Sequence, residues 1–390
     1  MKAALLYSHF FDSEGTDLMI GGIETYLLKL SEVCAEMGLR PILYQWSKKA
    51  FERNYNGLRV KGVPVFHLAY QKRSWALFQR AVNELNLAED ILVFGSDGQS
   101  VKNKCPRTIA IQHGIGWDMP VKFMTDRNIL QRKIVGGLYK AWLRKRYIAF
   151  FERCPNVVCV DYNFPNWYRT YLLSKPHVRY WVIPNFADIA PYEQIESRKK
   201  NRKKIKIIFS RRLCEYRGTL IMAAAAKRIL TRYSHVFFTF AGEGPDKITL
   251  KEYFRNESRV NFIKYAAHES LKVHMGHDIA VVPSLASEGT SLSVAEAMGC
   301  GCAVVATAVG GITNMIVDGY NGLLISPEVD ALVAALERLI ESPESIATLG
   351  ANAYQVAKTS FSLCQWKARW RQVFETMTTS GKKGLFTDPA

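Results

Sequence analysis

Two glutamates, Glu288 and Glu296, stand eight residues apart in the segment DIAVVPSLASEGTSLSVAEAMGCGC, separated by a loop of small residues. The run DIAVVPS is short and mostly apolar, which is typical of a buried parallel strand, and EGTS is too rich in Gly, Ser and Thr to continue it. From Leu292 the residues favour a helix that Gly299 and Gly301 end. The N–H groups of the loop therefore lie at a helix N-terminus, which attracts anions such as phosphate.

The two glutamates are expected to have different roles, because the first precedes the loop and the second lies inside the helix. We place Glu288 beside the non-phosphate part of a ligand. Glu296 is placed on the hydroxyls of a ribose, from which one carboxylate can accept two hydrogen bonds. The alternative is that Glu288 is a solvated loop acid and Glu296 an acid on a helix surface. The EGTS loop between them favours the ligand site.

The length and composition predict two well-packed domains. A chain of 390 residues is too long for one ordinary core, and 48% of its residues are hydrophobic.

The first residues, MKAALLYSHFF, contain one Lys and only a brief apolar run, so neither a signal peptide nor a transmembrane span is expected. Eight cysteines without a C-x-x-C pair suit reduced thiols in a cytoplasm.

The positive charge is concentrated in the first half of the chain. The formal net charge is +17, and residues 1–190 hold 26 Lys and Arg against 16 Asp and Glu. Residues 205–390 are closer to balance, with 20 against 17, and the segment EQIESRKKNRKK between the halves is predicted to be a linker. A basic surface favours a polyanion or an anionic membrane as its partner, although such a charge can also serve solubility alone.

Short apolar runs alternate with helical patterns in both halves, which predicts an α/β protein with two doubly wound parallel sheets. Ligands of such sheets bind outside the carboxyl ends of the strands, so we expect the QHG and EGTS segments to face each other across a cleft. Residues 362–377 read as one amphipathic helix that crosses back to the first domain. The predicted domains are residues 1–190 with 361–390, and residues 191–360. The end of the chain, TTSGKKGLFTDPA, is expected to be poorly ordered.

Taken together, these segments resemble the retaining glycosyltransferases of family four, which have the GT-B fold, and the resemblance covers essentially the whole chain. It rests on the E-x7-E segment and on IIFSRRLCEYRGT, FTFAGEGP, IPNFAD, GGIET and IQHG. Several positions depart from the family pattern: Arg211 and Phe186 replace glycines, Arg217 replaces a lysine, Asp161 stands where serine is common, and Lys264 stands where glycine is usual. The last departure leaves the identity of the donor base open.

The resemblance implies a role for each matched residue. It makes His113, Glu288, Arg212 and Arg217 catalytic, with both arginines on the donor diphosphate and His113 on the donor sugar. Asp161, where the family commonly has serine, either contacts a sugar hydroxyl or caps the next helix. The residues implied in donor binding are Gly21, Gly22, Arg212, Arg217, Gly242, Glu288, Gly289, Thr290, Ser291, Leu292 and Glu296.

The implied reaction moves a sugar from a nucleotide diphosphate sugar, with UDP or GDP as the expected nucleotide, to a hydroxyl of an acceptor with retention at the anomeric carbon. Two fixed cations would offset the charge of the departing diphosphate, so neither a metal nor a further cofactor is expected. The expected acceptor is a glycan or a polyprenyl-diphosphate-linked saccharide of a bacterial surface polysaccharide such as O-antigen, capsule or lipopolysaccharide. A sugar-nucleotide 2-epimerase of the same fold stays an alternative, as does, less favoured, a basic nucleic-acid-binding protein. A dehydrogenase is disfavoured because no G-x-G-x-x-G follows the first strand.

Residues 121–153 form a basic amphipathic pattern that could lie on an anionic bilayer. Leu130, Ile134, Leu138 and Trp142 recur at a spacing of four, and basic residues stand at other positions, among them Arg132, Lys133, Lys140, Arg144, Lys145 and Arg146. The alternative is an ordinary helix whose apolar stripe packs into the core, interrupted at Gly136-Gly137. The pattern favours a peripheral protein on the cytoplasmic face of the cytoplasmic membrane. Nucleic acid is not expected as a partner.

Overall fold

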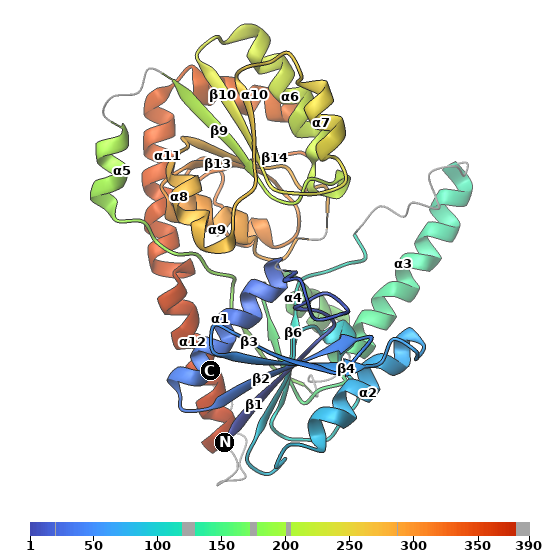
Figure 1. Ribbon diagram of the computed structural model, residues 1–390. Coiled ribbons are helices and arrows are strands. Elements are labelled where there is room, and N and C mark those ends of the chain that lie inside the picture. Colours follow the sequence, from blue (N-terminus) through green and yellow to red (C-terminus); the bar gives the residue numbers. More distant parts are fainter. Residues whose placement is uncertain (20, 119–128, 172–177, 200–203, 287, 380–390) are drawn as a thin grey trace.

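The computed structural model describes the chain except for Ile20, residues 119–128, 172–177, 200–203 and 287, and residues 380–390. The described residues form two sheets with helices on both faces, one sheet from each half of the chain (Figure 1). The predicted α/β architecture with two doubly wound sheets is therefore confirmed, with one antiparallel edge.

The first sheet has eight strands in the order β3-β4-β2-β1-β5-β6-β7-β8. Their bounds are β1 Lys2–Tyr7, β2 Arg40–Ser47, β3 Phe51–Tyr55, β4 Leu58–Pro64, β5 Ile91–Phe94, β6 Thr108–Gln112, β7 Asn156–Cys159 and β8 Arg179–Val182. All pairs are parallel except β3 with β4. The prediction of a wholly parallel sheet is wrong at this edge, because Asn56 (φ 48°) and Gly57 (φ 82°) make a tight hairpin turn.

Alternate residues of the strands enter two different cores, as the pleat of a sheet requires. Ala3 and Leu5 of β1 pack with α1 (Gly22–Glu36) on one face, whereas Ala4 and Leu6 pack on the other. The second face is covered by α2 (Tyr70–Val82), α3 (Ile129–Phe151) and α4 (Asn163–Tyr171). A short 3-10 helix, η1 (Asp97–Gln99), follows β5.

The second sheet has six parallel strands in the order β11-β10-β9-β12-β13-β14. Their bounds are β9 Ile205–Ser210, β10 Val236–Ala241, β11 Val260–Ile263, β12 Ile279–Val282, β13 Ala303–Thr307 and β14 Leu323–Ile325. The helices around it are α5 Tyr192–Lys199, α6 Thr219–Arg232, α7 Lys247–Tyr253, α8 Ser270–Met275, α9 Leu292–Gly299, α10 Val329–Ile340 and α11 Pro343–Val356. Short helical turns are η3 Glu215–Arg217, η4 Ala267–Glu269, η5 Gly310–Asn314 and η6 Ala357–Phe361.

The last helix, α12 (Leu363–Thr379), returns to the first sheet, as the sequence predicts. Trp366, Trp370 and Phe374 are at most 1% exposed and belong to the same core cluster as β1 and α1. Figure 1 shows this helix, at the red end of the colour scale, running down beside the first sheet. Residues at opposite ends of the sequence thus share one core.

Three local predictions from the sequence need correction or lie outside the described residues. The predicted linker is partly helical, because α5 includes its first seven residues, 193–199. The expected interruption of α3 at Gly136-Gly137 is absent, since the helix runs through both glycines. Most of the chain end that was expected to be poorly ordered, residues 380–390, lies outside the described residues.

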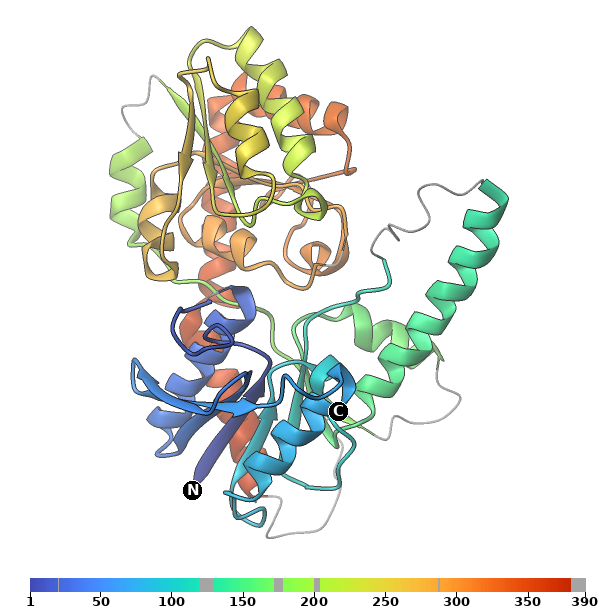
Figure 2. The ribbon, with the colours of Figure 1, turned by 45° about the vertical axis from the view of Figure 1, so that its right-hand side comes forward.

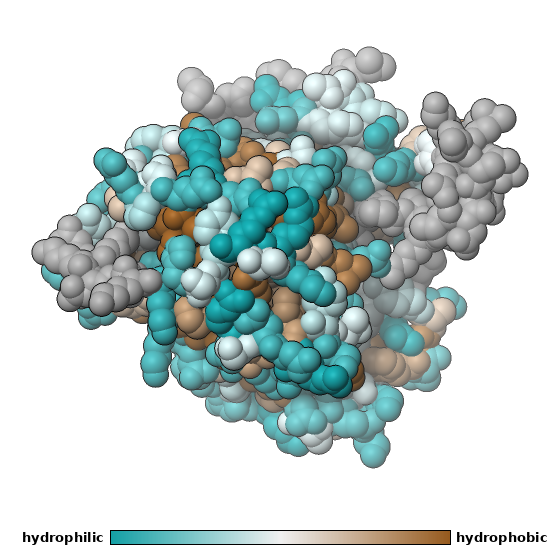
Figure 3. Space-filling model, turned by 90° about the horizontal axis from the view of Figure 1, so that it is seen from above, coloured by the Kyte–Doolittle hydropathy of each residue, from teal (hydrophilic) through white to brown (hydrophobic). Residues whose placement is uncertain are grey.

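Seen from above in Figure 3, the face over the second sheet mixes hydrophilic and hydrophobic residues. Among the described residues, no helix combines the length and the apolar composition that crossing a bilayer requires.

Candidate active site

Each of the two sheets has a switch point in its strand order. In each sheet the central strand has neighbours that lead away in opposite directions, and ligands bind in the crevice above such a point. In the second sheet this crevice lies between β9 and β12, so that Arg211 and Arg212 follow one strand and Ser284 the other. Sequence segments that are far apart therefore supply one site.

The carboxylate of Glu288 lies in a cluster of charges at this crevice. Its Oε1 accepts hydrogen bonds from Arg211, Arg217 and the hydroxyl of Ser284, the last at 2.8 Å. Burial alone would raise the pKa of this carboxyl, but the two guanidinium groups hold it below its ordinary value of 4.5. Glu288 is thus a buried, ionised group, and the alternative of a solvated loop acid is wrong.

The loop after Glu288 is packed backbone against backbone. A Cβ on Gly311 would lie 2.4 Å from the carbonyl carbon of Gly289, and a Cβ on Gly289 would lie 2.6 Å from a methyl group of Val160. Contacts of this kind leave room only for glycine at both positions. The double glycine at Gly310-Gly311 thus serves to let η5 press against the loop.

The same loop is the place where the two halves of the molecule touch. The Thr290 hydroxyl donates to the Val160 carbonyl oxygen at 2.7 Å and accepts from the Asn185 N–H at 2.8 Å. The N–H of Tyr162 donates to Asn314 Oδ1 at 3.0 Å. A movement of one domain relative to the other therefore acts directly on the loop that carries Glu288.

His113 lies on the opposite wall, directly after β6. Its Nε2 is 2.8 Å from the carbonyl oxygen of Gly95, and its ring meets the edge of Tyr26. Burial lowers the pKa of His113 to about 4, so the imidazole is neutral at pH 7. A neutral ring whose Nε2 donates to Gly95 leaves Nδ1 as an acceptor for a ligand hydroxyl.

Asp161 takes one of the two roles that the sequence left open for it, the helix cap, and its contact with a sugar hydroxyl stays a prediction. Its Oδ1 accepts from the N–H of Asn163 at 2.8 Å, at the start of α4. Its Oδ2 is buried without a hydrogen-bond partner among the described residues and lies beside Gly114 and Gly289. Burial raises the pKa of this carboxyl to about 6. Asp161 therefore caps a helix and also presents an unsatisfied oxygen at the junction of the domains.

The glycine pair Gly21-Gly22 opens α1, as the sequence predicts, and Gly22 lies near the start of α9. A Cβ on Gly22 would lie 3.4 Å from Leu292 Cδ1, at the first residue of α9. The N–H of Gly21 donates to Glu24 Oε2 at 2.8 Å, and the other oxygen of this carboxylate is 3.1 Å from His9 Nε2. Sequence reasoning missed His9, for which the only signal was its position at the end of the first strand.

Glu296 lies within α9 and is half-buried, so it is less exposed than the surface-acid alternative assumes. Burial raises its pKa to about 7, against a smaller opposing effect of a hydrogen bond from Ser270, and the nearby Asp188 adds to the rise. The N-terminus of α9 lies at Ser291, whose N–H points to Met315 Sδ at 3.1 Å. Glu296 thus lies in the second domain, behind the loop that carries Glu288.

The two arginines after β9 differ in environment. The side chain of Arg212 is exposed to solvent, and Gly242, at the end of β10, packs beneath the Arg211 carbonyl. The Arg211 side chain is only 5% exposed and contacts Glu288. The structure therefore brings Arg217 to Glu288 but not Arg212, and it adds Arg211, which the sequence marked only as a departure from glycine.

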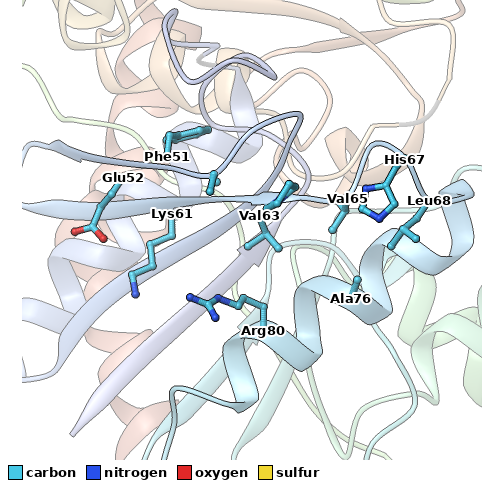
Figure 4. Close-up of a pocket in the computed structure, with 12 residues that line it drawn as sticks. Phe51, Glu52, Lys61, Val63, Val65, His67, Leu68, Ala76 and Arg80 are labelled. Carbon is cyan, nitrogen blue, oxygen red and sulfur yellow. The ribbon is translucent and has the colours of Figure 1, made fainter.

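A separate cavity of about 700 Å³ lies at the edge of the first sheet, between the β3–β4 hairpin and α2 (Figure 4). Its walls are mainly apolar, and its cations are engaged, because Lys61 and Arg80 both pair with Glu84, at 2.5 and 3.0 Å. None of the residues predicted for donor binding lines it. The cavity is therefore distinct from the site built around Glu288.

Part of the chain matches a known protein family, and the chain has curated relatives. Residues 192–356 match the family model "Glycosyl transferases group 1". The chain is 27% identical over 332 residues to the phosphatidylinositol N-acetylglucosaminyltransferase gpi3 subunit of Schizosaccharomyces pombe, covering 82% of this chain and 70% of that one.

Two solved structures share the fold over nearly the whole chain. The HepE protein of Anabaena in complex with UDP-glucose has a TM-score of 0.67 and 16% identity, covering 96% of this chain and 100% of its own. WaaG, described as a glycosyltransferase involved in lipopolysaccharide biosynthesis, has a TM-score of 0.66 and 15% identity, covering 96% and 99%. Residues 192–356 are a group 1 glycosyltransferase domain, and the chain is a glycosyltransferase with the GT-B fold.

Proposed function

We propose that this glycosyltransferase moves a sugar from a nucleoside diphosphate to a hydroxyl of a lipid-linked glycan, with retention at the anomeric carbon. The observation that carries the proposal is the charged cluster of Arg211, Arg217 and Glu288, which lies at the switch point of the second sheet. Residues 191–360 would bind the donor, and residues 1–190 with 361–390 the acceptor. His113, on the first sheet, would orient the donor sugar.

In the proposed reaction the bond between the anomeric carbon and the diphosphate oxygen breaks, and the acceptor oxygen bonds to the same face of that carbon. The proton of the acceptor hydroxyl passes to the departing phosphate oxygen. Arg212 and Arg217 stabilise the charge on the diphosphate, and the N-terminus of α9 adds backbone donors. Glu288 and His113 hold the sugar.

The donor is proposed to be a UDP- or GDP-sugar, and the proposal is supported by the UDP-glucose complex of HepE. Gly21, Gly22, Gly242, Gly289, Thr290, Ser291 and Leu292 would surround it, and Glu296 would accept hydrogen bonds from the ribose. Because fixed cations offset the diphosphate charge, we expect transfer to continue in the presence of EDTA. Loss of activity on chelation, restored by a divalent metal, would contradict this.

The acceptor is proposed to belong to a bacterial surface polysaccharide, such as O-antigen, capsule or lipopolysaccharide, and to be held on a lipid. WaaG supports a polysaccharide acceptor, and the yeast relative, named for phosphatidylinositol, supports a lipid-borne one. The decisive assay incubates the protein with sugar nucleotides and lipid-linked saccharides, followed by mass spectrometry and NMR of the products. A sugar joined to the acceptor with the donor's anomeric configuration supports the proposal. A new sugar still attached to nucleotide would instead identify a 2-epimerase.

Nucleotide affinity is expected to rise with pH between 6 and 8. The pKa of Glu296 is about 7, so its carboxylate, the better acceptor for ribose hydroxyls, forms as pH rises through that value. The ionised fraction changes about tenfold between pH 6 and 8. Calorimetric titration at several pH values checks this. Phosphate ionises in the same window, so Glu296→Gln is the control. A profile that Glu296→Gln leaves unchanged would remove Glu296 from the ribose site.

We also propose that α3 places the enzyme on the cytoplasmic face of an anionic membrane. Ile148 and Phe151 bury the C-terminal part of α3, whereas Leu138 and Trp142 are 69% and 51% exposed. Figures 1 and 2 show the helix projecting away from the rest of the protein. The exposed cations Arg144, Lys145 and Arg146 lie on the same helix. Side chains at 121–134, including Leu130 and Ile134, are outside this description.

Replacing Leu138 and Trp142 together with glutamate is expected to abolish co-flotation with vesicles that contain anionic lipid. The change removes two apolar side chains and adds two negative charges, which an anionic membrane repels. Each basic residue near the surface contributes about 1 kcal/mol of attraction to such a membrane. Ile248→Glu, at an 82% exposed position of α7, is the matched control and is expected to float like the wild type. Failure of the wild type itself to float at low salt would refute the membrane proposal.

A further inference from the structure

Glu288 has more positive partners than one carboxylate needs. Arg211 and Arg217 both donate to the same oxygen, Oε1, and the Ser284 hydroxyl donates to it as well. The two arginines differ in freedom, because the Arg211 side chain is 5% exposed and that of Arg217 is 25% exposed. One cation is therefore enclosed, and the other is open to the crevice.

Arg211 is fixed by its surroundings. Its Nη1 donates to the Ser284 hydroxyl at 2.6 Å, and its backbone N–H donates to the Ala241 carbonyl oxygen at 3.0 Å. Its Nε is buried with no hydrogen-bond partner among the described residues. A guanidinium held in this way keeps its contact with Glu288 whether or not a ligand is present.

Arg217 is placed to change partners. It ends the short turn η3, one residue before the start of α6, and its guanidinium lies over the ring of Tyr216 at the open side of the cluster. A diphosphate that enters the crevice carries two or more negative charges and competes with Glu288 for this cation. If Arg217 were the only counter-ion of Glu288, its departure would leave a buried carboxylate unpaired, which is costly.

We propose that Arg211 is a positioning residue that keeps Glu288 paired and in place when Arg217 turns to the donor diphosphate. The proposal rests on the proposed function, because it assumes that a diphosphate binds here. It gives a reason for arginine at a position where the resembled family has glycine. The enclosed arginine neutralises the carboxylate so that the open arginine is available to the ligand.

The test is a double-mutant cycle between positions 211 and 288, with binding of pyrophosphate and of UDP measured by calorimetry. Arg211→Met is expected to weaken binding about tenfold, which is about 1.4 kcal/mol, because Glu288 then retains Arg217. Glu288→Gln is expected to strengthen binding, because it releases Arg217. The double variant is expected to bind at least as tightly as the wild type. Arg228→Met, which removes a surface arginine paired with Asp330 on the same domain, is the matched control.

The outcomes separate this proposal from the proposed function. If the wild type binds neither pyrophosphate nor any of UDP, GDP, ADP and dTDP, both the role proposed for Arg211 and the proposed function are contradicted. If the wild type binds but the double variant is as weak as Arg211→Met, Arg211 contacts phosphate directly or only supports the fold, and the proposal is overturned. If Arg211→Met does not fold, Glu288→Gln alone still tests the proposal. Pyrophosphate binding by Glu288→Gln that is unchanged or weaker than that of the wild type would contradict the release of Arg217.

Discussion

Arg217→Ala is expected to lower kcat by about 10²- to 10³-fold, equivalent to about 2.7 to 4 kcal/mol of transition-state stabilisation. In the proposed reaction this arginine meets the charge that develops on the leaving diphosphate, so its contact is stronger in the transition state than in the ground state. Initial rates at saturating donor measure the effect. Because the lost contact also reaches the bound diphosphate, KM for the donor is expected to rise as well.

Arg217→Lys separates the charge from the shape of the side chain. Lysine is the residue of the resembled family at this position, and an ammonium binds phosphate as a point charge. We therefore expect Arg217→Lys to recover most of the rate that alanine loses. Turnover of Arg217→Ala within a few-fold of the wild type would show that Arg217 does not act on the leaving group.

Trp370→Ala is expected to destabilise the protein by about 3 to 5 kcal/mol, the usual cost of removing a buried tryptophan. Trp370 is fully buried between α12 and the first sheet, and its Nε1 donates to the Tyr26 hydroxyl at 2.9 Å. Its loss leaves a cavity and removes that donor, so the anchor between the crossing helix and the first domain weakens. Thermal or denaturant unfolding, followed by circular dichroism, measures the change.

Trp142→Ala is the control for this substitution, since Trp142 is 51% exposed on α3 and should change the free energy of unfolding little. Trp370→Phe keeps most of the volume and loses the hydrogen bond, so it should fall between the wild type and alanine. Equal midpoints for Trp370→Ala and Trp142→Ala would mean that α12 does not hold the first domain together.

The sequence predicts most of the fold because hydrophobic periodicity and strand alternation are local signals. The crossing helix could be foreseen since Trp366, Trp370 and Phe374 repeat at a spacing of four. The β3–β4 hairpin was missed although Asn56-Gly57 is a common hairpin turn, and its charged, half-exposed strands lack an apolar run. The strand β14, with three residues, was too short to stand out, and β8, RYWV, begins with an exposed arginine and has no fully buried residue.

Two members of the charged cluster, Glu288 and Arg217, were singled out from the sequence, but their contacts and the part played by Arg211 were not. Motif matching points to Glu288 and Arg217, yet only the fold shows that both meet at one oxygen with Arg211. Adjacent residues such as Arg211 and Arg212 point in different directions after a strand, and sequence alone does not say which one turns inward. The pairing of Thr290 with Val160 likewise joins segments that no local signal connects.

The most direct test of the proposed donor site is calorimetric binding of nucleoside diphosphates to the wild type, Arg212→Ala and Arg217→Ala. We predict that one nucleoside diphosphate among UDP, GDP, ADP and dTDP binds the wild type, and that each alanine variant weakens it by about tenfold or more. Binding that neither substitution changes, or the absence of binding by all four nucleotides, would contradict a diphosphate site at this crevice.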